Sequence, residues 1–172
     1  INYTPLLEAN LPANPAQVNI NDSAISEVFA KWQETPEFSS LIEEITANGE
    51  INIKTTSGFT LNGTPKPVAG NFAAGVTAFW SPSDRTINLN VNTTTPTRTG
   101  FQNGLSNLLF ELHNAKYDAE YQNLYDRAVG VKTPGFTSAE DFAEAVIAVE
   151  TQAAADWEAL AGGNPPLLTP VQ

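Results

Sequence analysis

The residues best suited to chemistry lie in one short stretch, Phe110-Glu111-Leu112-His113-Asn114-Ala115. Residues four apart in a helix share one face, so two histidines at this spacing can hold zinc while a glutamate beside the first acts as general base. Here Glu111 is present, but Phe110 and Asn114 occupy the two histidine positions. Because phenylalanine cannot ligate a metal and an amide is a poor zinc ligand, we expect no metal at this place.

His113 is the only histidine of the chain. A site built on several histidines is therefore impossible within one chain, and a serine or cysteine triad is not expected. His113 follows the glutamate by two positions and lies one residue before the expected ligand position, which turns its side chain by about 100° on a helix. We predict a surface histidine that makes a local hydrogen bond, rather than a shifted ligand or a general base.

Glu150 is the second carboxylate of interest, because it falls among apolar residues of the last predicted helix. An unpaired carboxylate in such a stripe would be costly, so we expect it to be buried with a partner. Together with Glu111 it could share a proton or bind a hard cation. The structural alternative, which we favour, is a hydrogen bond to a backbone or tyrosine group.

Four helices must position these side chains. The first is predicted from the cap signal at Asn21-Asp22-Ser23 to about Glu34, and the second from Pro36 to Asn48-Gly49. A long central helix is predicted from Gly100 to Ala128, and the last helix begins after Thr137 or Ser138 and ends at Gly162. Tyrosines recur every fourth residue along the central helix, and core and rim packing is favoured over a groove: they are Tyr117, Tyr121 and Tyr125.

The strands are few and short. A strand is predicted at Ile51 and Ile53, and an antiparallel hairpin is predicted from residues 76–80 and 86–91. Residues 57–71 are predicted to form a loop. We expect one domain over residues 1–172, with an extended N-terminal arm at about 1–20 that wraps it and an extended tail at about 164–172.

The composition excludes several classes of function. The 172 residues hold 19 acidic against 8 basic side chains, a net charge of −11, which would repel nucleic acid and anionic lipid. With no long apolar segment, the chain is expected to be soluble and to cross no membrane. It has no cysteine, which excludes disulfides and thiolate chemistry and leaves a secreted or a cytoplasmic location equally open. No cofactor motif is present, so we expect none.

The order of these features resembles a known family. A strand reading Arg85-Thr86-Ile87-Asn88-Leu89-Asn90, a polar connector and then the motif helix are similar to the zincin metallopeptidase-like domain. The small bacterial zincins, whose motif reads His-Glu-Leu-x-His-Ala, are the most similar, over roughly residues 78–157. The resemblance implies an α+β fold in which a short antiparallel sheet packs on a long central helix. It also implies lost ligands at Phe110 and Asn114, a retained general-base position at Glu111, and a third-ligand position at Glu150.

These features support two hypotheses about function. The first is a non-catalytic protein-binding or structural protein on a degenerate zincin-like domain, a pseudoenzyme whose partner is another protein or a second copy of itself. The second is a hydrolase that uses Glu111 and Glu150 with an altered or absent metal site. An ordinary amphipathic helix that matches the motif by accident remains the alternative to the resemblance itself.

Overall fold

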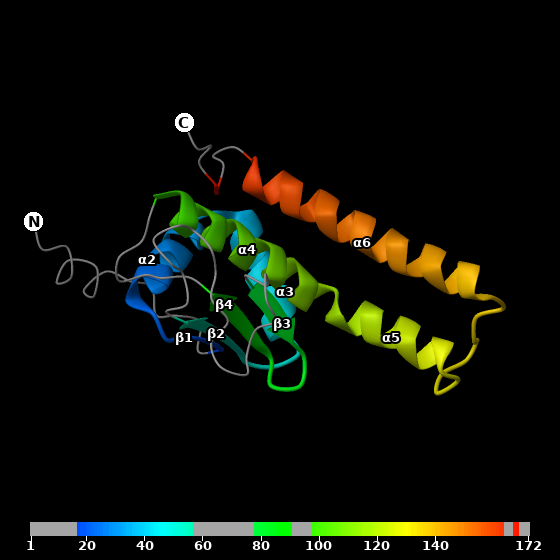
Figure 1. Cartoon of the computed structure of the whole chain (residues 1–172). Helices are drawn as coiled ribbons and strands as arrows, with labels where there is room; N and C mark the ends of the chain where they lie inside the picture. Colours follow the sequence, from blue (N-terminus) through cyan, green and yellow to red (C-terminus); the bar gives the residue numbers. More distant parts are fainter. Residues whose placement is uncertain (1–16, 57–77, 91–97, 164–166, 169–172) are drawn as a thin grey trace, which may run out of the picture.

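The computed structural model describes residues 17–56, 78–90, 98–163 and 167–168, and the fold is given for these (Figure 1). Helices and a small sheet both contribute, which confirms the α+β class. In chain order the elements are β1 (Val18–Ile20), α2 (Ser23–Trp32), α3 (Pro36–Thr46), β2 (Ile51–Thr56), β3 (Ala78–Ser81), β4 (Thr86–Asn90), α4 (Arg98–Lys116), α5 (Asp118–Ala128) and α6 (Ala139–Ala161).

The first two helices begin where the sequence predicts. Asp22 caps α2 by accepting a hydrogen bond from the Ile25 backbone N–H at 3.1 Å. Pro36 opens α3, where a first turn tolerates its missing N–H. Their apolar faces are buried: Phe29 and Phe38 are both 0% exposed, and their rings meet edge to face at 5.2 Å.

The four described strands form one mixed sheet in the order β1-β2-β4-β3. The predicted hairpin is confirmed, since β3 and β4 pair antiparallel with Trp80 opposite Ile87. The other two pairings are parallel, which corrects the expectation of an antiparallel sheet. Parallel neighbours need a crossover connection, and α2 with α3 provides it between β1 and β2.

The long central helix is the part of the fold that the sequence describes least well. It is two helices, α4 and α5, because the backbone leaves helical geometry at Tyr117 (φ −92°, ψ 7°). Neither glycine nor proline stands there, so no local signal marks the break. The α4 part lies against β3 and β4 on one side and against α3 and α6 on others. Its leucines are fully buried: Leu108, Leu109 and Leu112.

The last helix, α6, is capped by Ser138, which accepts from the Asp141 backbone N–H at 3.1 Å. It runs along α5 and then along α4, so that α5 and the first half of α6 form a hairpin that extends away from the sheet (Figure 1). We call this pair of helices the α5–α6 hairpin. No helix in the described part of the chain is both long and apolar enough to cross a membrane.

Both ends of the described chain join the core. The expected N-terminal arm is wrong for its last residues, because Val18 to Ile20 form β1 in the sheet. In the expected tail, the backbone oxygen of Leu167 accepts a hydrogen bond from the Trp32 indole at 3.1 Å. The rest of the arm, the loop at 57–71 and the rest of the tail lie outside the described residues.

Arg85 ties the β3–β4 turn to the end of α3. Its Nη2 donates to the backbone oxygen of Ile45 at 2.7 Å and of Gly49 at 3.3 Å. Its Nε donates to the oxygen of Glu50 at 3.1 Å, and the guanidinium lies 5.5 Å from the Trp80 ring centre. The arginine thus satisfies carbonyls at a helix C-terminus, where a positive charge is also favourable.

We therefore expect Arg85→Ala to lower the free energy of unfolding by about 2 to 3 kcal/mol, because several charged hydrogen bonds are lost at once. Urea denaturation measures this. The matched control is Lys31→Ala, which removes only an exposed ion pair with Glu34 and should cost under about 1 kcal/mol. Equal effects of the two substitutions would show that the arginine contacts do not hold the turn to α3.

Candidate functional site

Glu111 lies on the side of α4 that faces β3. Its side chain is buried, with 8% exposed. It accepts a hydrogen bond from Asn114 Nδ2 at 2.9 Å and another from the backbone N–H of Trp80. Burial raises the pKa of this carboxyl above its ordinary value, and the two hydrogen bonds partly oppose that rise.

These contacts occupy the carboxylate. Trp80 belongs to β3, which has a neighbouring strand on one side only among the described strands. A backbone amide on such an edge needs a partner when it is buried, and Glu111 supplies one. Glu111, at the retained general-base position, therefore links α4 to the edge strand β3.

The other two motif positions are not arranged as a ligand pair. Phe110 is 45% exposed, and Asn114 turns its amide nitrogen toward Glu111. Among the described residues, no group of three or more His, Cys, Asp or Glu side chains is placed to hold a metal ion. Asp118, one further turn along, accepts from the Trp80 indole nitrogen at 3.2 Å.

The structure does not bring Glu150 to Glu111. Glu150 is exposed on α6, which corrects the expectation of a buried carboxyl. Its charge acts on Tyr121 of α5, whose pKa is raised by burial first and by the Glu150 charge second. The apolar stripe of α6 is narrow at this point: Val149 is half-buried, and Glu150, one position further along the helix, is exposed to solvent.

His113 is buried rather than on the surface, with 2% of the side chain exposed. The expected local hydrogen bond is present, since Nδ1 donates to the Leu109 backbone oxygen at 2.7 Å. Burial lowers the pKa of the imidazole, so the ring is neutral at neutral pH. With the proton on Nδ1, Nε2 is left as an acceptor.

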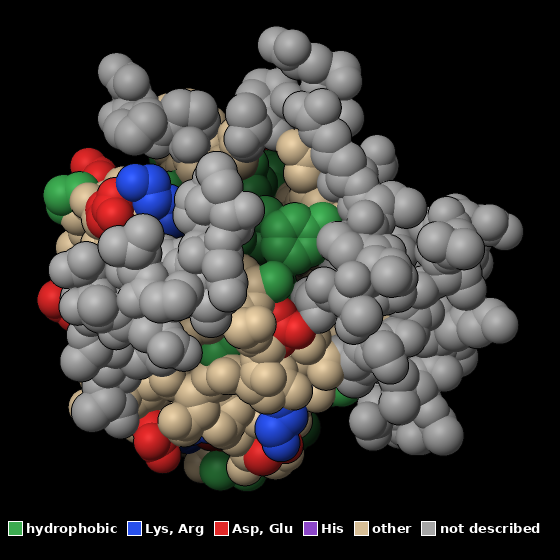
Figure 2. Space-filling view, turned by 90° about the vertical axis from the view of Figure 1, so that its left-hand side faces the viewer, with side chains coloured by type: hydrophobic (Ala, Val, Ile, Leu, Met, Phe, Trp, Pro, Cys, Tyr) green, Lys and Arg blue, Asp and Glu red, His purple; other side chains and the backbone are tan. Residues whose placement is uncertain are grey.

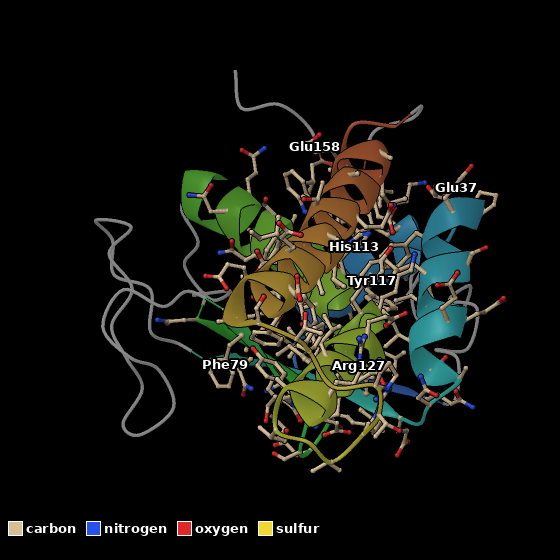
Figure 3. All side chains as sticks on the ribbon, turned by 90° about the vertical axis from the view of Figure 1, so that its right-hand side faces the viewer. Glu37, Phe79, His113, Tyr117, Arg127 and Glu158 are labelled. Carbon is tan, nitrogen blue, oxygen red and sulfur yellow. The ribbon has the colours of Figure 1, made fainter. Side chains whose placement is uncertain are left out.

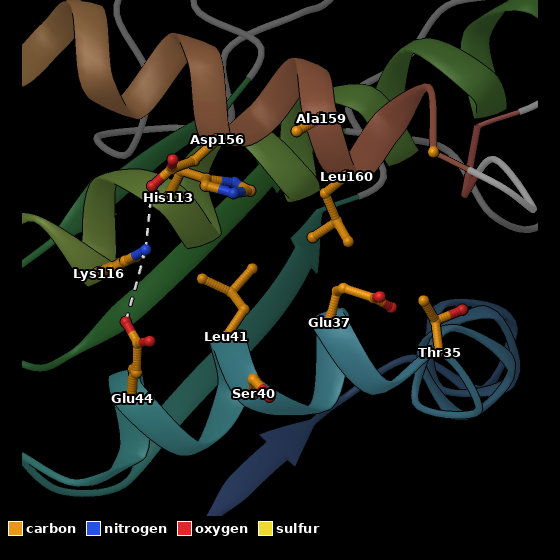
Figure 4. A pocket seen from close by; sticks show the side chains of 11 residues that line it. Thr35, Glu37, Ser40, Leu41, Glu44, His113, Lys116, Asp156, Ala159 and Leu160 are labelled. Atoms are coloured by element: carbon orange, nitrogen blue, oxygen red, sulfur yellow. Dashed lines mark hydrogen bonds and ion pairs between the residues drawn. The ribbon is translucent and has the colours of Figure 1, made fainter.

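Beside His113 the structure assembles a polar cluster that the sequence reasoning missed. Asp156 of α6 accepts from Lys116 Nζ at 3.0 Å, from the Tyr117 hydroxyl at 2.5 Å and from Gln152 Nε2 at 2.8 Å. Lys116 also lies 3.5 Å from Glu44 of α3 (Figure 4). The cluster joins three helices, and Figure 3 shows His113 and Tyr117 between α6 and α3.

The hydrogen bonds of this cluster set the pKa of Asp156. Burial acts to raise the pKa of Asp156, but the hydrogen bonds from Tyr117, Lys116 and Gln152 outweigh it and hold that pKa at about 2. Asp156 is therefore ionised at neutral pH, and its negative charge faces the Lys116 ammonium. One signal could have indicated the cluster, because His113, Lys116 and Tyr117 are spaced to share a helix face.

A cavity of about 280 Å³ opens at this cluster, between α3, α4 and the end of α6. Leu41 and Leu160 form apolar walls (Figure 4). The polar lining includes Glu37, His113 and Lys116. On another face of the molecule, Figure 2 shows acidic and basic side chains scattered among the described residues rather than gathered into one patch.

Tyr117 and Tyr121 pack between helices, as the favoured prediction stated, whereas Tyr125 is half exposed at the rim. Tyr117 binds Asp156, and Tyr121 is half-buried beside α6. Tyr125 packs its ring 5.8 Å from that of Phe142. All three side chains thus contact α6, and Tyr125 also leaves 53% of its surface exposed.

Comparison with known proteins identifies no relative: no family model, no curated protein and no solved structure matches the chain.

The burial of Glu111 leads to a pH-dependent prediction. A carboxyl whose pKa is raised by folding favours the protonated form, so its contribution to stability is present in acid and is lost as the pH rises through the raised pKa. We expect the free energy of unfolding of the parent, relative to Glu111→Gln, to fall as the pH rises above about 4.3. Urea denaturation across a pH series measures this difference, and a difference that stays constant would contradict it.

Removing the side chain should have a larger effect. Glu111→Ala leaves the Trp80 amide and Asn114 without their partner and should cost about 1 to 3 kcal/mol at neutral pH. Glu150→Ala is the matched control, because that carboxylate is exposed and its loss should cost under about 0.5 kcal/mol.

Proposed function

We propose that the chain is a non-catalytic protein-binding protein built on a degenerate zincin-like domain, and that the end of the α5–α6 hairpin is its binding surface. The observation that carries the proposal is the apolar side chains left exposed there. Val129 and Val131 are each 73% exposed and Tyr125 is 53% exposed. Exposed apolar groups clustered on an element that projects from the body are typical of protein interaction sites.

The composition of this surface also fits protein recognition. Phe142 packs between Tyr125 and Phe136, the latter at 5.4 Å between ring centres. Arg127 lies 4.3 Å over the Phe136 ring. Aromatic residues and arginine are the types enriched at binding hot spots. We call this surface the hairpin tip: Tyr125, Arg127, Val129, Val131, Phe136 and Phe142.

The state of the motif supports the non-catalytic part of the proposal. A general base must be able to reach a proton on a substrate or water. Glu111 instead accepts from Asn114 and from the Trp80 backbone, and Glu150 is on the surface of another helix. The order of β3, β4 and α4, with the motif helix packed on the strand pair, supports the zincin-like part.

The partner is a second copy of the chain or another protein. If it is a second copy, sedimentation velocity over a concentration series should show that the parent associates. Val129→Asp with Val131→Asp should weaken that association at least about tenfold, because each charge at a desolvated contact costs more than about 1 kcal/mol. Ala154→Asp with Ala155→Asp is the matched control: it adds the same charge to exposed positions of α6 away from the tip and should change nothing.

A monomeric parent would point to another protein. A photoreactive phenylalanine analogue placed at position 131 should then cross-link a defined partner in extracts of the source cells, whereas the same analogue at position 154 should not. Equal products from both positions would remove the hairpin tip as the binding surface.

A separate prediction concerns metal. We expect the purified chain to hold no stoichiometric zinc by elemental analysis, because Phe110 and Asn114 replace the two imidazoles. Phe110→His with Asn114→His should gain at most weak zinc binding, since Glu150 does not lie near this face to serve as a third ligand. One zinc per parent chain that survives mild chelation would overturn the non-catalytic proposal.

A further inference from the structure

We propose that the cavity between α3, α4 and α6 binds an alkylammonium group, supplied by a free small amine or by a lysine side chain. This site is distinct from the hairpin tip and does not depend on it. The proposal rests on the shape of the cavity, on the open acceptor of His113, and on the carboxylates around the opening.

The cavity suits a short alkyl chain. At about 280 Å³ it is smaller than most drug-binding pockets and holds a ligand of on the order of ten heavy atoms. Leu41, Ala159 and Leu160 supply apolar lining. Burying a few methylene groups against them favours binding by the hydrophobic effect.

His113 offers a hydrogen-bond acceptor inside the cavity. Its Nδ1 is engaged with the Leu109 oxygen, so the ring cannot turn without losing that bond. Its Nε2 has no partner among the described residues, although the side chain is 2% exposed and lines the cavity. Figure 4 shows the ring directed into the space between α4 and α6. Because Nε2 is an acceptor that can be reached from the cavity, a ligand that brings an N–H donor can bind it.

The charged side chains that line the cavity favour a cation over an anion. Glu37, Glu44 and Asp156 line the cavity with one positive side chain, Lys116. Lys116 already contacts both Glu44 and Asp156, so it has little capacity left to attract an anion. Glu37 forms no ion pair with a described residue, and Ser40 adds a hydroxyl nearby. An ammonium group in the cavity can therefore donate to Nε2, while Glu37, which lies beside Thr35 at the other end of the lining (Figure 4), and the net charge of −11 favour its approach.

The test is a titration of the ¹⁵N-labelled full chain with n-butylammonium, followed by amide and His113 ring chemical shifts. We expect saturable shifts at His113, Leu41 and Leu160, with millimolar affinity as is usual for so small a ligand. n-Butanol and butyrate, which keep the alkyl chain and change the head group, should bind at least about tenfold more weakly, the factor of one lost charged contact.

Two variants locate the ligand. Glu37→Gln keeps the shape and removes the charge, and should weaken butylammonium binding at least about tenfold. Glu43→Gln makes the same change on an exposed residue of α3 outside the cavity, and should leave the affinity unchanged. Ala159→Phe starts from an exposed residue and fills the cavity; it should abolish binding while the melting temperature stays near that of the parent.

A final arm distinguishes the two sources of the ammonium. A lysine-containing peptide that competes with butylammonium, and loses this ability when its lysine is acetylated, would identify a protein side chain as the ligand. Butylammonium binding without peptide binding would identify a free amine. The absence of saturable shifts with both probes, or shifts unaffected by Glu37→Gln and Ala159→Phe, would overturn the proposal.

Discussion

The burial of α4 on several sides is the constraint on which the rest of the structure depends. Leu108, Leu109 and Leu112 are all 0% exposed, because the helix lies between the sheet, α3 and α6. The residues on either side of Leu112 are enclosed with it, whereas Phe110, beside Leu109, is 45% exposed. Glu111 and His113 are therefore buried, and each must find a partner or pay a desolvation cost.

Glu111 and His113 find their hydrogen-bond partners on different sides of α4. Glu111 turns to the sheet, where it satisfies an amide of the edge strand β3. His113 turns to the helices and uses its own helix backbone, which leaves one nitrogen open to the cavity. In the motif that resembles a metal-binding helix, Glu111 thus links α4 to the sheet. The group that a ligand could reach is the His113 nitrogen on the other side of the helix.

The molecule offers its two candidate binding surfaces at separate places. The cavity lies in the body, where Lys116, Tyr117 and Asp156 join α3, α4 and α6. The hairpin tip lies beyond the sheet, where α5 and α6 pack against each other and part of their apolar surface stays exposed (Figure 1). Exposed apolar side chains such as those of the hairpin tip are free to contact another molecule.

The sequence by itself determined the local elements: the cap at Asp22, the proline at the start of α3, the β3–β4 hairpin and the cap at Ser138 all depend on neighbouring residues and were predictable. Only the tertiary structure decided the rest. The parallel pairing of β1 and β2, the break at Tyr117, the exposure of Glu150 and the burial of His113 each depend on which element lies alongside. Periodicity in the sequence shows that a helix has an apolar face. The width of that face and the partners of its polar residues are set by contacts between residues far apart in the chain, such as Lys116 and Asp156, which are 40 positions apart.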